Sequence, residues 1–294
     1  MTAPSSLPDR PLFEVTRQIT DTLTPMYGAG EAKAMVQIIF ENLKGWTPVD
    51  MAIRANEPVS GYIQGKIKAV VDRLLESEPI QYIFGTADFY GMKLKVTRDT
   101  LVPRPETAEL VDIIVNENRR KDLRVLDLGT GSGCIAIALS RNLPFADVTA
   151  ADISDGALAV ARENGKTLHA DVEFIKADIL TLADNPGAAG EGPYDIIVSN
   201  PPYVAESEKK DMEANVLRYE PAGALFVPDD DPLEFYKAIL RYAAVALAPD
   251  GKLYFEINPL FTAELLSEAR KEGFGDLSVT RDSFGKERFL RAAR

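Results

Sequence analysis

Residues 124–133 read RVLDLGTGSG, an apolar run that leads directly into a turn with three glycines. The apolar part, residues 124–128, predicts a strand. Glycines at the end of a strand let the backbone approach a ligand closely, and the helix that follows presents its unpaired N–H groups to an anionic group such as a carboxylate. The segment therefore predicts a strand, a ligand-binding turn and the start of a helix.

Strands and helices alternate from this segment to the end of the chain. The stretches that predict further strands are residues 148–152, 172–175, 194–198 and 252–257. The helical patterns run from the glycine turn to residue 143 and over residues 157–168, 233–247 and 261–271. Residues 277–280 and 288–291 predict an antiparallel pair at the edge. This alternation predicts an α/β fold, a doubly wound sheet with helices on both faces and ligands at the carboxyl ends of its strands.

The first part of the chain has a different pattern. Between residues 12 and 77 the apolar side chains recur at helical spacing, with turn signals at residues 27–30 and 45–48. This pattern predicts a small all-helical domain. We expect it to cover residues 1–78.

A hairpin is expected to join this helical domain to the sheet. Residues 82–84 and 93–96 form short alternating stretches around Tyr90 and Gly91, which predicts two paired strands. The expected organisation is a helical N-terminal domain over 1–78, a hairpin linker over 79–104 and an α/β domain over 105–294.

The composition excludes several kinds of chemistry. The chain of 294 residues has a single cysteine, Cys134, and a single histidine, His169, which leaves almost no residues for a zinc site or a Ser-His-Asp hydrolase. We expect no metal, and Cys134 is expected to pack in the core. The net charge of −12, from 45 acidic and 33 basic side chains, disfavours a broad nucleic-acid surface.

The expected location follows from what the sequence lacks. No apolar run approaches the roughly 18 residues of a membrane span. The first ten residues have neither the basic nor the apolar part of a signal peptide. The sequence therefore predicts a cytoplasmic protein that does not bind membranes.

The spacing of the glycines separates this turn from related nucleotide-binding turns. It is GxGxG, whereas the dinucleotide fingerprint needs GxGxxG, and it lacks the Lys-Ser/Thr of a phosphate loop. Asp152 lies at the end of the next predicted strand, 23 residues after Gly129, where a carboxylate suits a ribose diol. The turn and this acid together predict a nucleoside cofactor.

A second motif follows the strand at residues 194–198. Residues 198–203 read VSNPPY. Two consecutive prolines remove two backbone donors and fix two φ angles, so nearby carbonyl groups are held rigidly and are free to accept. The motif predicts a pair of rigid acceptors, the side-chain oxygen of Asn200 and the carbonyl of Pro201, beside the ring of Tyr203.

The two motifs together resemble a known class. DxGxGxG followed by an acid at the second strand is similar to the Rossmann-type methyltransferases that use S-adenosylmethionine, and NPPY resembles the branch that methylates planar nitrogens. Further segments resemble the HemK/PrmC release-factor glutamine methyltransferases: QYIFG (81–85), FYG (89–91), LVPRPET (101–107), YEPAGAL (219–225) and GKERF (285–289). The resemblance implies a Rossmann-like class I methyltransferase with a mostly parallel seven-stranded sheet, and a helical N-terminal domain for release-factor recognition.

The same resemblance implies the reaction. The methyl group of S-adenosylmethionine would pass to the side-chain amide nitrogen of the glutamine in the Gly-Gly-Gln loop of class-1 peptide chain release factors, a protein methylation that acts on translation termination. An amide nitrogen is a poor nucleophile because its lone pair is delocalised. Two acceptors that hold its N–H groups can orient it and favour positive charge on it. No strong general base is then required.

The family's functional residues fall on matching positions here. Cofactor contacts are implied for Asp127, Gly129, Thr130, Gly131, Ser132, Gly133, Asp152, Asp178, Ile179 and Asn200. Catalytic roles are implied for Asn200, Pro201 and Tyr203. Substrate contacts are implied for Asn200, Pro201, Pro202 and Tyr203, and also for Arg104, Glu106 and Thr107, for which an ion-paired helix start is the alternative.

The chain departs from the family pattern at two places. Ile179 stands where an aromatic residue often stacks on adenine, so an apolar contact is expected instead. Residues 256–259 read EINP, where the family usually has a glycine and a glutamine after the acid. We expect this second segment to lie away from the methyl-transfer centre.

Three other functions compete with this interpretation. One is an N6-adenine methyltransferase acting on DNA or RNA, against which stand the acidic charge, the absence of an evident target-recognition module and the PRPET (103–107) and YEPAGAL segments. Another is a ribosomal-protein glutamine methyltransferase, which shares the core motifs. The last is a binding module that has lost catalysis. The expected partner is a class-1 release factor, without direct contact to nucleic acid, and the expected oligomeric state is a monomer.

Overall fold

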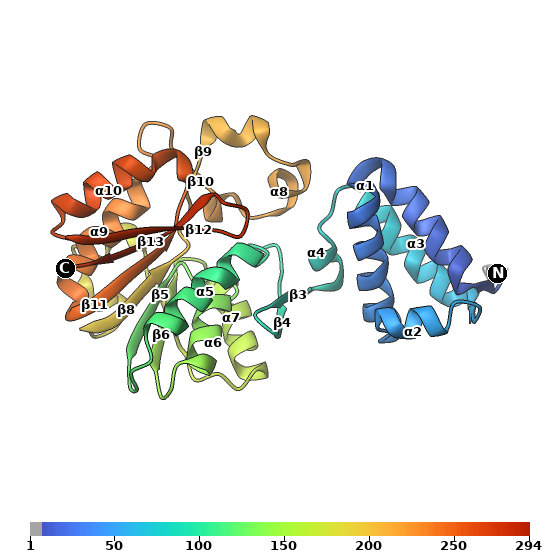
Figure 1. Cartoon of the computed structure of the whole chain (residues 1–294), viewed down its shortest axis with the longest axis horizontal. Helices are drawn as coiled ribbons and strands as arrows, with labels where there is room; N and C mark the ends of the chain where they lie inside the picture. The colour runs from blue at the N-terminus through green and yellow to red at the C-terminus, as the bar shows by residue number, and fades with distance from the viewer. Residues whose placement is uncertain (1–7) are drawn as a thin grey trace. The chain divides into compact units, whose positions relative to one another are not determined.

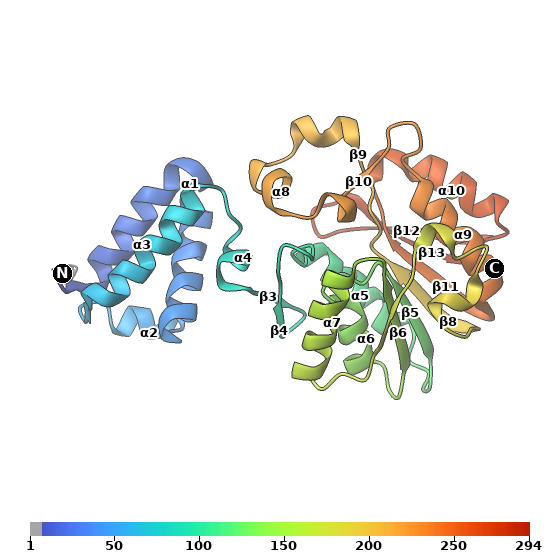
Figure 2. The same ribbon diagram turned by 180° about the vertical axis from the view of Figure 1, so that it is seen from behind.

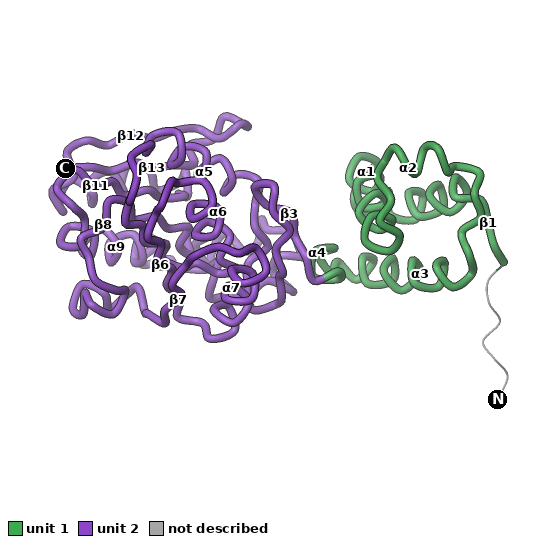
Figure 3. The backbone as a smooth tube through the Cα atoms, turned by 90° about the horizontal axis from the view of Figure 1, so that it is seen from below, with its two compact units in different colours: residues 1–84 green, residues 85–294 purple. Residues whose placement is uncertain are grey.

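The computed structural model describes residues 8–294. Residues 1–7, which include most of the segment examined for a signal peptide, lie outside the described residues. The chain divides into two compact units, residues 1–84 and residues 85–294 (Figure 3). The border falls inside the segment expected to be a linker, and the hairpin belongs to the second unit.

The first unit is helical. It contains α1 (Leu12–Lys44), α2 (Pro48–Ile53), α3 (Gly61–Leu75) and α4 (Ile80–Phe84), with a short antiparallel pair of β1 (Arg10–Pro11) and β2 (Pro58–Val59). The α1 helix breaks at Gly28, which has φ 79° and ψ 159° and lies in the first expected turn. Its end at Gly45 is left-handed, and Thr47 and Asp50 form a capping box that starts α2. Both turn signals thus mark real interruptions of the helices.

The segment at residues 82–84 is helical, so its expected strand is wrong. The Pro79 carbonyl accepts the N–H groups of Tyr82 and Ile83 at 3.0 and 3.1 Å, which closes a helical turn. The hairpin lies further on, in β3 (Thr86–Phe89) and β4 (Met92–Lys95). Its two turn residues, Tyr90 and Gly91, have φ 48° and 71°, the positive angles that a tight two-residue hairpin turn requires.

A seven-stranded sheet organises the second unit. Its spatial order is β12-β13-β11-β8-β5-β6-β7. The strands are β5 (Arg124–Leu128), β6 (Asp147–Asp152), β7 (Glu173–Lys176), β8 (Tyr194–Ser199), β11 (Leu247–Glu256), β12 (Asp276–Arg281) and β13 (Glu287–Ala293). β13 runs opposite to the other six strands of this sheet, so its pairings with β11 and β12 are antiparallel and the others are parallel. The mostly parallel sheet with an antiparallel edge is therefore confirmed.

Helices cover both faces of the sheet (Figures 1 and 2). The helices α5 (Pro105–Glu117), α6 (Cys134–Asn142) and α7 (Asp155–Thr167) lie on one side, and α9 (Glu234–Ala246) and α10 (Thr262–Lys271) lie on the other. The alternation along β5 fits this arrangement, because Leu126 and Leu128 belong to the buried cluster that includes α9 and α10 side chains, while Val125 belongs to the one that includes those of α5 and α6. Burial of both faces accounts for the continuous apolar character of the central strands.

A smaller excursion separates β8 from α9. It contains the parallel pair β9 (Val204–Ala205) and β10 (Phe226–Val227) and the short helix α8 (Ala214–Tyr219). The strand β5 lies between β6 and β8, so the chain turns to opposite sides of β5 as it builds the sheet. A crevice forms at the carboxyl ends of strands where the order reverses in this way. Within residues 8–294 no helix is both long and apolar enough to cross a membrane.

Gly133 is the position where the glycine turn constrains the fold most strongly. Its φ is 82°, and a Cβ added there would lie 3.1 Å from the Ile137 Cδ1 and 3.2 Å from the Ala161 Cβ. We expect Gly133→Ala to lower the free energy of unfolding by about 1–2 kcal/mol from the left-handed backbone alone, with a further loss from these contacts. The shift in the urea denaturation midpoint measures the effect.

Gly187→Ala is the matched control for this substitution. Its backbone is not left-handed and an added Cβ meets nothing within 4 Å, so it should leave the midpoint nearly unchanged. Equal midpoints for the two variants would contradict the strain argument.

Candidate active site

The glycine turn joins β5 to α6 in a left-handed path. Gly129, Gly131 and Gly133 have φ of 74°, 56° and 82°. Residues with a side chain larger than hydrogen rarely adopt such φ angles, so these three positions require glycine. The turn brings backbone N–H groups at the start of α6 to the carboxyl edge of the sheet.

Asp127 supports this turn from below. Its Oδ2 accepts hydrogen bonds from the Thr130 hydroxyl at 2.7 Å and from the Ala136 N–H at 3.2 Å. The side chain is fully buried, and this burial raises the pKa of Asp127 to about 7. Asp127 does not line the cavity described below, so the structure places this expected cofactor residue beneath the turn.

Asp152 lies at the end of β6 and connects the turn to α7. Its Oδ2 accepts from the Gly131 N–H and its Oδ1 accepts from the Ser154 N–H, both at 2.9 Å. A carboxylate oxygen has more than one lone pair, so both oxygens retain capacity to accept from a diol. The orientation of this carboxylate is therefore set by the backbone before any ligand binds.

Asp178 and Ile179 follow β7 and form the next side of the site. The Asp178 Oδ1 accepts from the Leu180 N–H at 2.9 Å, which fixes the start of a short 3₁₀ turn. Ile179 packs over the glycine turn, since a Cβ on Gly129 would lie 3.6 Å from its Cδ1. An aliphatic surface thus lies next to the turn.

One cavity of about 490 Å³ opens at these strand ends. Its volume falls within the roughly 300–1,000 Å³ of small-molecule sites. Residues expected from the sequence that line it are Arg104, Thr107, Gly129, Thr130, Gly131, Ser132, Asp152, Asp178, Ile179, Asn200 and Pro202. Gly133 and Glu106, like Asp127, do not line it.

A second, smaller cavity of about 50 Å³ adjoins the first. Asn200 lines both cavities, and Pro201 and Tyr203 line the smaller one. Residues 200–203, called the acceptor motif below, and the glycine turn therefore lie at the same edge of the sheet. Asn200 lies where the two cavities meet. Methyl transfer between the two places requires this geometry.

Hydrogen bonds hold the acceptor motif in place. The Asn200 Nδ2 donates to the Thr107 hydroxyl oxygen at 3.3 Å, and the Thr107 hydroxyl donates to the Glu256 Oε2 at 2.7 Å. The Tyr203 hydroxyl donates to the Glu256 Oε1 at 3.0 Å. Burial and the nearby Glu256 carboxylate raise the pKa of Tyr203, so its hydroxyl stays protonated.

The segment at residues 256–259 contacts the acceptor motif directly, so the expectation that it lies away from the centre is wrong. Besides the Glu256 contacts, the Asn258 Nδ2 donates to the Tyr203 carbonyl at 3.0 Å and to the Glu208 Oε2 at 2.9 Å. The reason is that β11 pairs in parallel with β8, so both strands end at the same edge. An acid at the end of a predicted strand was the signal that could have identified Glu256.

The residues of the PRPET segment differ in their environments. Arg104 lines both cavities and forms an ion pair of 2.6 Å with Glu220, whose side chain is 1% exposed. Thr107 is 2% exposed. The ionic partner of Arg104 thus comes from the excursion after β8, whereas the alternative interpretation placed an ion pair at the helix start itself.

Two further residues reach the larger cavity. Phe235 of α9 lines it together with Ile179, so an aromatic ring is present although position 179 lacks one. Its sequence context gives no signal, because it follows no strand end. Cys134 also lines the cavity, and burial raises the pKa of its thiol to about 12, so the thiol stays protonated at neutral pH.

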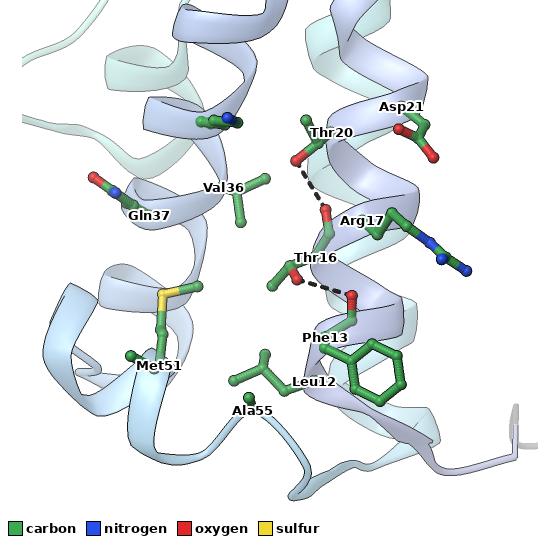
Figure 4. A pocket seen from close by; sticks show the side chains of 12 residues that line it. Leu12, Phe13, Thr16, Arg17, Thr20, Asp21, Val36, Gln37, Met51 and Ala55 are labelled. Atoms are coloured by element: carbon green, nitrogen blue, oxygen red, sulfur yellow. Dashed lines mark hydrogen bonds between the residues drawn. The ribbon is translucent and has the colours of Figure 1, made fainter.

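The first unit has a separate groove of about 470 Å³ between the two parts of α1 and α2 (Figure 4). Leu12, Val36 and Met51 give it an apolar lining. The hydroxyls of Thr16 and Thr20 donate to the carbonyls of Phe13 and Thr16 in their own helix. These hydroxyls are therefore bonded within their own helix, and the charged and amide side chains at this groove include Arg17, Asp21, Lys33 and Gln37.

The cavity of the second unit fits S-adenosylmethionine. The amide groups of the turn suit a carboxylate, Asp152 suits a ribose diol, and Ile179 offers an apolar surface to a base. Fold and site together define the class: this is an S-adenosylmethionine-dependent methyltransferase of the class I, Rossmann-like type.

Sequence comparisons identify the family within this class. Residues 14–85 match the family described as PrmC N-terminal domain, and residues 106–224 match Methyltransferase small domain. The chain is 46% identical over 280 residues to a release factor glutamine methyltransferase of Bacteroides thetaiotaomicron, an alignment that covers 95% of this chain and 99% of that protein. It is 40% identical to one of Flavobacterium psychrophilum, with 93% and 96% covered. The chain belongs to the release factor glutamine methyltransferase (PrmC) family.

Solved structures agree with the fold. A methyltransferase from Pyrococcus furiosus superposes with a TM-score of 0.50 at 20% identity and covers 75% of this chain and 95% of that chain. A 16S rRNA methyltransferase from T. thermophilus in complex with AdoMet and guanosine has a TM-score of 0.50 at 19% identity, with 71% and 49% covered. At these identities the likeness concerns the fold alone.

The contacts of Asp152 yield a binding prediction. We expect Asp152→Ala to weaken S-adenosylmethionine binding by about 1.5–3 kcal/mol, the scale of hydrogen bonds to a charged group. Isothermal titration calorimetry measures the change. Asp155→Ala is the control, because this neighbouring side chain is 79% exposed and pairs with Lys176 outside the cavity. Equal affinities in both variants would remove Asp152 from the cofactor site.

Proposed function

We propose that this protein transfers a methyl group from S-adenosylmethionine to the side-chain amide nitrogen of the glutamine in the Gly-Gly-Gln loop of class-1 peptide chain release factors. The observation that carries the proposal is the position of Asn200, which lines both the larger cavity and the smaller one beside it. The relatives named as release factor glutamine methyltransferases support the substrate class.

The acceptor pair is proposed to hold the substrate amide. Bound S-adenosylmethionine supplies an electrophilic methyl group on a sulfonium sulfur. The Asn200 side-chain oxygen and the Pro201 carbonyl would accept the two N–H groups of the glutamine amide and favour positive charge on its nitrogen. The two acceptors would orient the nitrogen towards that methyl group, and the proton that the nitrogen must lose on methylation would pass to an acceptor or to water.

The backbone around Pro201 supports this role. Among residues 8–294, no backbone N–H donates to the Pro201 carbonyl oxygen. The Tyr203 N–H donates to the Leu225 carbonyl at 3.2 Å, and the Val204 N–H donates to the same carbonyl at 2.9 Å. The loop is thus anchored just after the prolines, and the ring of Tyr203 is held by Glu256 where it can pack against a planar amide.

The remaining site residues take the following proposed roles. Those proposed to contact the cofactor are Gly129, Thr130, Gly131, Ser132, Asp152, Asp178, Ile179 and Asn200, with Asp127 and Gly133 acting through the turn. Those proposed to contact the substrate are Asn200, Pro201, Pro202, Tyr203 and Arg104, and also Glu106, which lines neither cavity. Thr107 is proposed to act through Asn200, because its hydroxyl bonds to that amide.

The proposal extends to the organisation of the whole chain. The helical domain over 1–78 recognises the release factor, the segment over 79–104 links it to the sheet, and residues 105–294 carry out the methyl transfer. The protein acts as a monomer in the cytoplasm, without direct contact to nucleic acid or membrane. The acidic net charge of −12 supports the exclusion of nucleic acid.

Labelled S-adenosylmethionine tests the substrate. We expect label to pass to a class-1 release factor and, by mass spectrometry, to lie on the glutamine of its Gly-Gly-Gln loop. A release factor with that glutamine replaced by alanine is the control and should stay unlabelled. Label on DNA, on RNA or on a ribosomal protein instead would establish one of the competing functions.

The acceptor role of Asn200 gives a kinetic prediction. Asn200→Ala removes one of the two acceptors and should lower kcat by about 10²–10³-fold, the scale for loss of one preorganised hydrogen-bonding group. Single-turnover kinetics and the thermal unfolding midpoint separate chemistry from folding. Asn142→Ala is the control, since its amide donates to the Ala138 carbonyl in its own helix and it lines neither cavity. Near-normal turnover in Asn200→Ala would refute the assigned role.

A further inference from the structure

We propose that Glu256 and Thr107 are positioning residues that determine which end of the Asn200 amide faces the substrate. The inference rests on the proposed function, in which the Asn200 oxygen accepts from the glutamine amide. An asparagine side chain has an oxygen at one end and an NH₂ group at the other, and the two ends have nearly the same shape. Shape alone therefore cannot orient it.

A buried carboxylate begins the chain of hydrogen bonds. Glu256 is 2% exposed and accepts from two hydroxyls, that of Thr107 at 2.7 Å and that of Tyr203 at 3.0 Å. An ionised carboxylate can only accept, so each hydroxyl must direct its single hydrogen at it. Glu256 thus determines that both hydroxyls act as donors in these two hydrogen bonds.

The direction of the hydrogen bond between Asn200 and Thr107 follows from that of the bond between Thr107 and Glu256. Because the Thr107 hydrogen is directed at Glu256, the Thr107 oxygen can only accept from Asn200. The Asn200 Nδ2 lies 3.3 Å from that oxygen and donates to it. The Asn200 Oδ1 is therefore the end left for the space where the two cavities meet. The opposite orientation would direct an NH₂ group at the substrate's own NH₂ group.

Opposing influences act on the charge of Glu256. Burial raises the pKa of Glu256, and Glu106 acts in the same direction. The two hydroxyl donors and Arg288 of β13 lower it, and Arg288 also pairs with Asp282 at 3.3 Å.

Two more titratable side chains face this group and bear no charge at neutral pH. Burial raises the pKa of Tyr236, whose hydroxyl donates to the Glu256 carbonyl at 2.9 Å, and the pKa of Cys134. Within this hydrogen-bonded set the Glu256 carboxyl is therefore the group that loses its charge on acidification. Once protonated, the carboxyl can donate a hydrogen bond. The direction of the hydrogen bonds that run from Asn200 through Thr107 to Glu256 is then no longer determined.

Three substitutions test the proposal in the full chain. Glu256→Gln keeps the shape but adds a donor, and Thr107→Val keeps the shape but removes the hydroxyl. Each should lower kcat for release-factor methylation about 10–100-fold while the Kd for S-adenosylmethionine and the thermal unfolding midpoint stay close to those of the unmodified protein. Thr107→Ser keeps the hydroxyl and should restore most of the rate.

Two further readouts distinguish positioning from a merely structural role. The double variant Thr107→Val with Glu256→Gln should lose little more rate than either single variant, because both break the same chain. The kcat of the unmodified protein should fall on acidification as Asp127 and Glu256 are protonated, whereas Glu256→Gln retains only the Asp127 contribution. The ratio of the two kcat values should therefore decrease as the pH drops through the raised pKa of Glu256. Additive losses, or a ratio that does not change with pH, would overturn the inference.

Glu117→Gln is the matched control. Glu117 lies at the other end of α5 and also accepts from a tyrosine hydroxyl, that of Tyr254 at 2.9 Å, but it lines neither cavity. The kcat of Glu117→Gln should equal that of the unmodified protein. If Asn200→Ala loses activity while Glu256→Gln and Thr107→Val do not, this inference fails alone. If Asn200→Ala stays active, or the release factor is not methylated, the proposed function fails.

Discussion

The parallel register of the central strands brings the site together. Leu128 of β5 pairs with Ser199 of β8 and with Ala151 of β6, and Ser199 pairs with Phe255 of β11. The next residue on each strand is therefore at the same level, and these residues are Gly129, Asn200, Asp152 and Glu256. The Ser199 hydroxyl donates to the Leu128 carbonyl at 2.7 Å and holds the two central strands in this register. A shift of one residue would separate the glycine turn from the acceptor motif.

Buried carboxylates convert this row of residues into an oriented site. Asp127 holds the glycine turn from below, and Glu256 orients the hydroxyls of Thr107 and Tyr203. Burial makes each carboxylate harder to ionise, as the raised pKa values of both groups indicate. Hydrogen bonds from neighbouring hydroxyl and amide groups oppose that effect. Such groups are costly to bury for stability alone, so their role in arranging polar ligands is the more natural explanation.

Much of this arrangement could be predicted from the chain alone. The strands at residues 124–128 and 194–198, the turn at Gly129 and the acid at Asp152 each carry a local signal, because glycine, proline and apolar alternation constrain the backbone where they occur. The segment at residues 82–84 misled the prediction, because an alternating pattern over three residues also suits a single helical turn. The helix buries Ile80 and Tyr82 in the tertiary structure, which favours it over a strand.

By itself, the sequence determined the class of fold, the cofactor turn and the acceptor motif, since each depends on neighbours along the chain. Only the tertiary structure decided the partners of that motif. Thr107 and Glu256 lie 93 and 56 residues from Asn200. The pairing of β11 with β8 places Glu256 beside it, and α5 brings Thr107 within hydrogen-bond distance of both. A hydrogen bond across such a separation leaves no local pattern, because it depends on the pairing of strands and not on the residues between them.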